Sequence, residues 1–77
     1  MNIIELRKRI KKEKIPLDSY SLDGGMPNDR YCLKKTSIGW EVYYSEMGKK
    51  HNVKKYLSEQ EACNDLYSRL KKMTNLM

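Results

Sequence analysis

Ser58-Glu59-Gln60-Glu61 marks the start of a helix. The Ser58 hydroxyl can accept a hydrogen bond from the backbone amide of Glu61, and the Glu61 carboxylate can reach back to the amide of Ser58, which is a capping box. Leu57 and Ala62 take the positions of a hydrophobic staple. Apolar residues then recur at helical spacing: Ala62, Cys63, Leu66, Leu70 and Met73. We therefore predict a helix that starts at Ser58 and packs through this stripe.

Three strands are predicted before this helix, over residues 30–36, 39–46 and 50–57. The second strand alternates most clearly, and its two sides are Trp40, Val42 and Tyr44 on one and Glu41, Tyr43 and Ser45 on the other. Short connections between the strands suit hairpins. The lysines of the third strand are typical of a sheet edge, because charge discourages pairing with other chains.

Residues 2–14 are predicted to form a first helix, whose apolar stripe is Ile3, Leu6 and Ile10. Pro16 prevents its continuation, and residues 17–29 carry turn signals and are predicted to be irregular. The element order is thus α-β-β-β-α. We predict one α+β domain, residues 1–77, with a three-stranded antiparallel sheet and both helices packed on one face.

The sequence offers no signal of a secreted or membrane protein. Cys32 and Cys63 do not make a disulfide framework of the secreted kind. There is no apolar segment of signal-peptide length and no apolar run near the roughly 20 residues that cross a bilayer. We expect a cytoplasmic protein that does not bind membranes and is a monomer or a weak homodimer.

Catalytic and metal-binding patterns are also missing from the sequence. His51 is the only histidine, and Cys63 lies on the apolar stripe of the last helix, so a Cys–His nucleophile pair is not indicated. The two cysteines lack the short paired spacing of a zinc site. Asp23-Gly24-Gly25 lacks the strand, helix and lysine of a phosphate-binding loop. We expect no enzymatic activity, no metal and no cofactor.

The formal net charge of +6 favours acidic partners, including nucleic acids. Basic residues of the first helix and the third strand form a candidate nucleic-acid site: Arg7, Lys8, Lys11, Lys49, Lys50 and Lys54. The α-β-β-β-α order is also that of double-stranded RNA-binding domains, but the last helix of that family begins with a basic cluster. Here Glu59 and Glu61 occupy that position. Segment 39–67 also resembles, in pattern, the arm-binding domain of tyrosine recombinases.

Three stretches of the sequence belong together: residues 20–33, residues 40–46 and the Ser-x-x-Glu-Ala-Cys helix start, here Ser58 to Cys63. They resemble a family of small, mostly uncharacterised proteins of low-GC Gram-positive bacteria. Some members of that family resemble immunity proteins of polymorphic toxin systems. The resemblance implies an inhibitor that binds a toxin, and it implies no catalytic residues.

We therefore expect a non-enzymatic protein-binding module, immunity-like in its function. Such a module needs aromatic anchors ringed by polar groups, and the outer sheet face with the preceding loop supplies the candidate residues: Tyr43, Glu41, Ser45, Asn28 and Arg30. Inhibitors of nucleases are usually acidic, whereas this chain is basic, so the expected target is an acidic protein. The alternative hypothesis is a nucleic-acid-binding domain that uses the basic residues named above.

Overall fold

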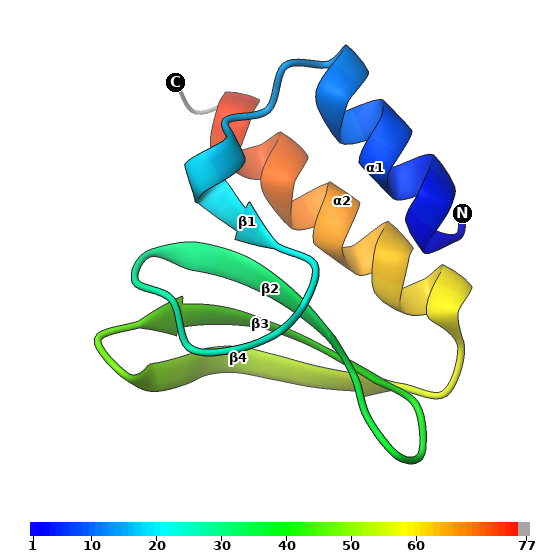
Figure 1. The fold of residues 1–77 in the computed structure, drawn as a ribbon, viewed down its shortest axis with the longest axis vertical. Coiled ribbons are helices and arrows are strands. Elements are labelled where there is room, and N and C mark those ends of the chain that lie inside the picture. Colours follow the sequence, from blue (N-terminus) through cyan, green and yellow to red (C-terminus); the bar gives the residue numbers. More distant parts are fainter. Residues whose placement is uncertain (76–77) are drawn as a thin grey trace.

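The computed structural model describes residues 1–75 of the chain. Over this range the elements are α1 (Ile3–Lys12), a short 3-10 helix η1 (Leu17–Ser19), β1 (Tyr20–Ser21), β2 (Arg30–Lys35), β3 (Trp40–Glu46), β4 (Lys49–Tyr56) and α2 (Glu59–Asn75). Both helices lie on the same side of the sheet, and α2 lies between α1 and the strands (Figure 1). The predicted α+β class is confirmed.

The sheet differs from the prediction in one strand. Its order is β1-β2-β3-β4, and β1 pairs with β2 in parallel, whereas the other pairs are antiparallel. The prediction of a three-stranded antiparallel sheet is therefore wrong, and the sheet is four-stranded and mixed. Tyr20 and Ser21 pair with Tyr31 and Cys32. Two residues are too few to show the alternation by which a strand is found in a sequence.

The core lies between the helices and the inner face of the sheet. It unites the apolar stripe of each helix with alternate residues of β2 and β3, and its buried members are Leu6, Ile10, Ile15, Leu22, Leu33, Val42, Ala62, Cys63, Leu66 and Leu70. The helical spacing of the sequence therefore identified the packed face of both helices. Burial of this set is the main source of stability in a domain of this size.

The start of α2 follows part of the capping prediction. The amide of Glu61 donates to the Ser58 hydroxyl over 3.1 Å, as predicted. A different carboxylate, that of Glu59 in α2, caps the start of α1. It accepts a hydrogen bond from the backbone amide of Ile3 over 2.9 Å. The predicted staple is wrong, because the Leu57 side chain is 86% exposed while Ala62 is buried. One acid thus joins the two helix starts, and Leu57 is left at the surface.

β4 is an edge strand, as its lysines predicted, and it contains a bulge. Val42 pairs with Lys54 and Tyr44 with His51, so that two residues of β4, Asn52 and Val53, oppose Tyr43. Asn52 has a positive φ of 53°. The bulge turns the Asn52 carbonyl toward α2, where it accepts a hydrogen bond from Arg69 over 2.9 Å.

Candidate functional site

The structure buries the centre of the predicted binding face. Tyr43 and Ser45 are both 0% exposed, so the expectation that this aromatic ring is open to a partner is wrong. Tyr43 is in contact with the loop of residues 22–29, which connects the parallel strands β1 and β2. The Tyr43 hydroxyl donates to the carbonyl of Gly25 in this loop over 2.7 Å. Tyr43 therefore anchors the loop within the domain.

The other predicted partner-binding residues are spread around that covered region. Glu41 is half-buried, and its carboxylate accepts from Lys50 over 3.2 Å. Arg30 is half-buried at the start of β2, where it pairs with Ser45. Asn28 is exposed in the loop. The residues thus share one side of the sheet, but they form no open aromatic surface.

The two thiols are not in activating surroundings. Cys32 and Cys63 are both buried and both free. Burial raises the pKa of each thiol, which is the opposite of the shift that makes a cysteine nucleophilic. Within residues 1–75, no group of three or more histidine, cysteine, aspartate or glutamate side chains has the geometry to hold a metal ion.

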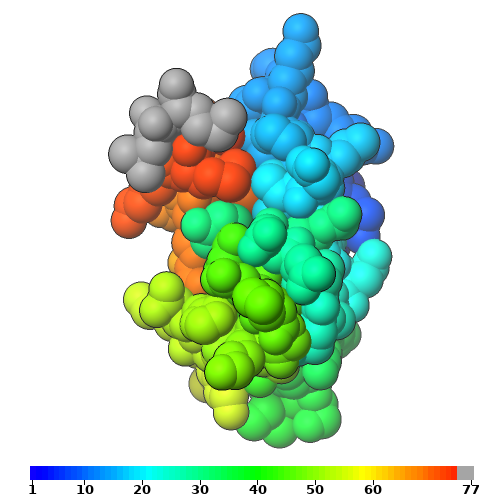
Figure 2. All heavy atoms as spheres, turned by 90° about the vertical axis from the view of Figure 1, so that its left-hand side faces the viewer, coloured from blue at the N-terminus to red at the C-terminus, as the bar shows by residue number. Residues whose placement is uncertain are grey.

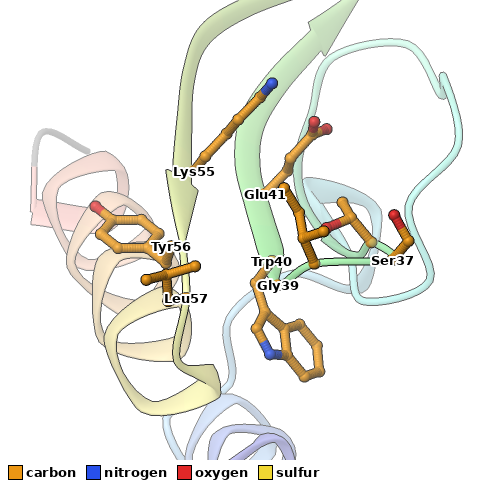
Figure 3. A pocket seen from close by; sticks show the side chains of 9 residues that line it. Ser37, Gly39, Trp40, Glu41, Lys55, Tyr56 and Leu57 are labelled. Atoms are coloured by element: carbon orange, nitrogen blue, oxygen red, sulfur yellow. The ribbon is translucent and has the colours of Figure 1, made fainter.

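An open apolar site lies instead at the end of the sheet next to the start of α2. Ile38 is 79% exposed and Leu57 is 86% exposed, and both line a groove of about 270 Å³ together with the half-buried Trp40. The full lining is Thr36, Ser37, Ile38, Gly39, Trp40, Glu41, Lys55, Tyr56 and Leu57. Figure 3 shows the Trp40 indole extending in one direction, and the Glu41 and Lys55 side chains in the opposite one. We call this feature the Ile38–Leu57 groove.

Backbone contacts fix the two walls of the groove. The β2–β3 turn is closed by a hydrogen bond from the amide of Thr36 to the carbonyl of Gly39 over 2.8 Å. Gly39 lies so close to β4 that a Cβ atom at this position would be 2.3 Å from the carbonyl oxygen of Tyr56. Only glycine lets the turn approach residues 56–57 this closely. The groove is therefore held by the sheet itself rather than by a loose loop.

A polar network holds the wall at Tyr56 against α2. The Tyr56 hydroxyl donates to Asp65 over 2.7 Å, and Arg69 pairs with the same carboxylate over 3.0 Å. The hydrogen bond to Asp65, followed by burial, raises the pKa of Tyr56 to about 12. This network fixes the last residue of β4 beside the groove.

Two lysine amines lie at the Ile38–Leu57 groove: Lys55 is part of its lining, and the Lys35 amine is 5.8 Å from the centre of the Trp40 ring. Lys34 and Lys35 precede the turn on β2, and Lys54 and Lys55 precede Leu57 on β4. Among the residues that the structure describes, no carboxylate lies within 4.0 Å of these four amines. The one acid of the lining, Glu41, is paired with Lys50. The groove is thus apolar at its centre and positive at its rim.

The basic residues of the nucleic-acid hypothesis fall into two separate clusters. Arg7, Lys8 and Lys11 are exposed on α1, whereas Lys49, Lys50 and Lys54 lie on β4. Figures 1 and 2 place α1 and β4 at opposite ends of the molecule. The structure therefore does not bring these six residues together on one surface, and nucleic-acid binding stays a prediction.

Comparison with known proteins adds no assignment, because no protein-family model, curated protein or solved structure matches this chain. Among residues 1–75 there is also no helix with the length and apolar character needed to span a membrane.

Sequence reasoning missed Ile38 and Leu57 as site residues. A signal for Ile38 was present, because turn positions are usually polar and a large aliphatic residue in a hairpin turn is unusual. For Leu57 the sequence indicated burial, since a residue directly before the Ser58 cap is expected to pack against α2.

Proposed function

We propose that this chain is a non-enzymatic protein-binding module of the immunity type, and that it binds its partner through the Ile38–Leu57 groove. One observation carries the proposal: two aliphatic side chains, 79% and 86% exposed, lie beside a half-buried tryptophan on a rigid groove. Exposed apolar clusters of this kind mark interaction sites in proteins more often than they mark ordinary surface.

The energetics of the groove suit a binding hot spot. Full burial of an aliphatic side chain stabilises a complex by about 1.5–3 kcal/mol, and Ile38 and Leu57 are exposed enough to gain most of this on binding. Tryptophan is enriched among residues that dominate binding energy, and Trp40 is already held by its place in β3. A rigid groove also loses little conformational entropy when a partner binds.

The immunity type is supported by the family resemblance, which includes residues 40–46 and therefore Trp40. An immunity protein acts by covering a toxin's active site or a neighbouring surface, which requires a rigid domain and no catalytic residues. The positive rim of the groove favours a target with acidic groups around the contact. An acidic toxin domain is the partner that fits best.

Affinity capture from the source cell tests the proposal. The tagged wild-type chain is expected to retain a stoichiometric partner, and the double variant Ile38→Ser, Leu57→Ser is expected to lose it. Both side chains are exposed, so the variant keeps the fold, which circular dichroism checks. The matched control is Met47→Ser, since Met47 is 81% exposed in the turn between β3 and β4. Retention of the partner by the double variant would refute the groove as the binding site.

A further inference from the structure

β4 leaves one edge of the sheet open. It is the last strand in the order β1-β2-β3-β4, so β3 pairs with one side of it only. Residues 49–55 of the strand are all exposed. No helix or loop of residues 1–75 pairs with this edge as a strand. An open edge presents backbone amides and carbonyls that can pair with another extended chain.

The register shows which groups point outward. The amide of Thr36 donates a hydrogen bond to the carbonyl of Gly39, so these two residues form a hydrogen-bonded pair at the turn between β2 and β3. Along an antiparallel pair of strands, hydrogen-bonded pairs alternate with non-hydrogen-bonded ones. The backbone groups of Trp40 and Val42 therefore point toward β4, where they meet those of Tyr56 and Lys54. It follows that the amides and carbonyls of the residues between them on β4, Val53 and Lys55, point away from the sheet.

The bulge limits the open edge to its second half. At Asn52 the strand is irregular, and the carbonyl of this residue is already occupied by Arg69. The regular edge therefore runs from Val53 to Tyr56, where β4 ends. Lys55, Tyr56 and Leu57 also line the Ile38–Leu57 groove, so the open edge leads directly into it.

Charge selects what can pair with this edge. Lys54 and Lys55 have no carboxylate within 4.0 Å among the described residues. A second copy of the chain would place lysines against lysines, since side chains on neighbouring strands are about 5 Å apart. If the added segment carries aspartate or glutamate instead, the electrostatic interaction with Lys54 and Lys55 at this distance is attractive.

We propose that the partner adds an extended acidic segment to the edge Val53–Tyr56 as a fifth strand, and that one apolar side chain of this segment enters the Ile38–Leu57 groove. The proposal rests on the protein-binding function proposed above, and it names the chemistry of the partner. The backbone of the edge supplies affinity, and the lysines and the groove supply specificity.

Selection from random dodecapeptides displayed on phage tests this chemistry, with the wild-type chain as the bait. We expect the selected peptides to carry aspartate or glutamate on both sides of one leucine, isoleucine or phenylalanine. Recovery of basic or uncharged peptides, or of none, would overturn the proposal. So would a concentration-dependent dimer of the chain that uses this edge.

Matched variants then locate the contact by fluorescence anisotropy of a selected peptide. Lys54→Glu with Lys55→Glu is expected to weaken binding roughly tenfold or more, because two attractive contacts become repulsive. Lys8→Glu with Lys11→Glu makes the same change of charge on α1 and is expected to alter the affinity less than about twofold. Equal losses in the two variants would overturn the proposal, since the charge effect would then be general.

N-methylation of the peptide tests the backbone pairing without a change in the protein. Methyl groups at alternate residues block one edge of an extended peptide, and we expect one of the two methylation patterns to lose roughly tenfold in affinity while the other binds normally. Equal binding of both peptides would overturn the added strand. If no acidic peptide binds but the Ile38 and Leu57 variants still lose a captured protein, the protein-binding function stands and only the acidic strand fails.

Discussion

The hydroxyl of Tyr43 connects the middle of the sheet to the loop of residues 22–29. Its ring lies under Lys50, whose amine is 4.5 Å from the ring centre, and its hydroxyl donates to the carbonyl of Gly25. Alternation along β3 correctly placed this side chain on the face opposite Val42. Whether that face is open depends on a loop eight residues long, and the sequence holds no local pattern for the path of such a loop.

Tyr43→Phe is expected to destabilise the domain by about 1 kcal/mol, because the carbonyl of Gly25 loses its donor in a partly buried site. Urea unfolding measures the change, and hydrogen exchange is expected to quicken at Gly24 and Gly25. Tyr67→Phe is the control, since it removes an exposed bond to Glu13 and is expected to cost less. Equal costs for the two variants would contradict the anchoring role of Tyr43.

The bond between Tyr56 and Asp65 predicts a loss of stability at high pH. The folded-state pKa of Tyr56 is raised from 10.0 to about 12. Between these values the folded chain keeps a proton that the unfolded chain releases, so the free energy of unfolding falls as the pH rises from about 10 to about 12. The stability difference between the wild type and Tyr56→Phe is therefore expected to shrink over this range in urea titrations. A constant difference would show that the bond does not control this titration.

At the scale of elements, the helices and the three long strands were predictable because each repeats a pattern several times. The stripe of α2 has five apolar members, and β3 carries Trp40, Val42 and Tyr44 at every second position. β1 was not predictable, since its two residues pair only because Gly24 and its neighbours return the chain beside β2. The amide of Gly24 donates to the carbonyl of Leu33 over 3.0 Å, which holds that return in place.

Gly39→Ala tests the close approach of the β2–β3 turn to β4. The added methyl group would lie 2.3 Å from the Tyr56 carbonyl oxygen, so the strands must separate, and we expect a loss of about 2 kcal/mol in the free energy of unfolding. Ser37→Ala, at an exposed position of the same turn, is expected to change it by less than about 0.5 kcal/mol. Chemical denaturation compares the two, and a neutral Gly39→Ala would contradict the rigid wall of the groove.

Over the whole molecule, the net charge of +6 is divided between distant clusters. The sequence shows how many basic residues there are, but their separation depends on α2 lying between α1 and the sheet (Figure 1). Exposure of Ile38 and Leu57 is likewise a property of the assembled domain. It arises because the turn and the β4–α2 connection meet at one end of the sheet, beyond the reach of both helices' apolar faces.

Nucleic-acid binding is expected to be weak and to depend only modestly on salt. Each cluster offers about three basic residues to one duplex, so the slope of log K against log salt should be about −3. Anisotropy titrations of labelled duplex DNA and RNA at several ionic strengths measure it. A slope near −6, lost equally on substitution of Lys8 or Lys54, would show that the clusters act as one surface.

Site-directed photo-crosslinking tests the central claim most directly, because it reports contact with the partner at single positions. A photoreactive benzoylphenylalanine is placed at Ile38, at Leu57 or, as a control, at Met47, and the chain is irradiated in extract of the source cell. We predict one protein adduct of the same mass from positions 38 and 57 and none from position 47. An adduct from position 47 alone, or none from 38 and 57, would contradict the assignment of the groove as the binding site.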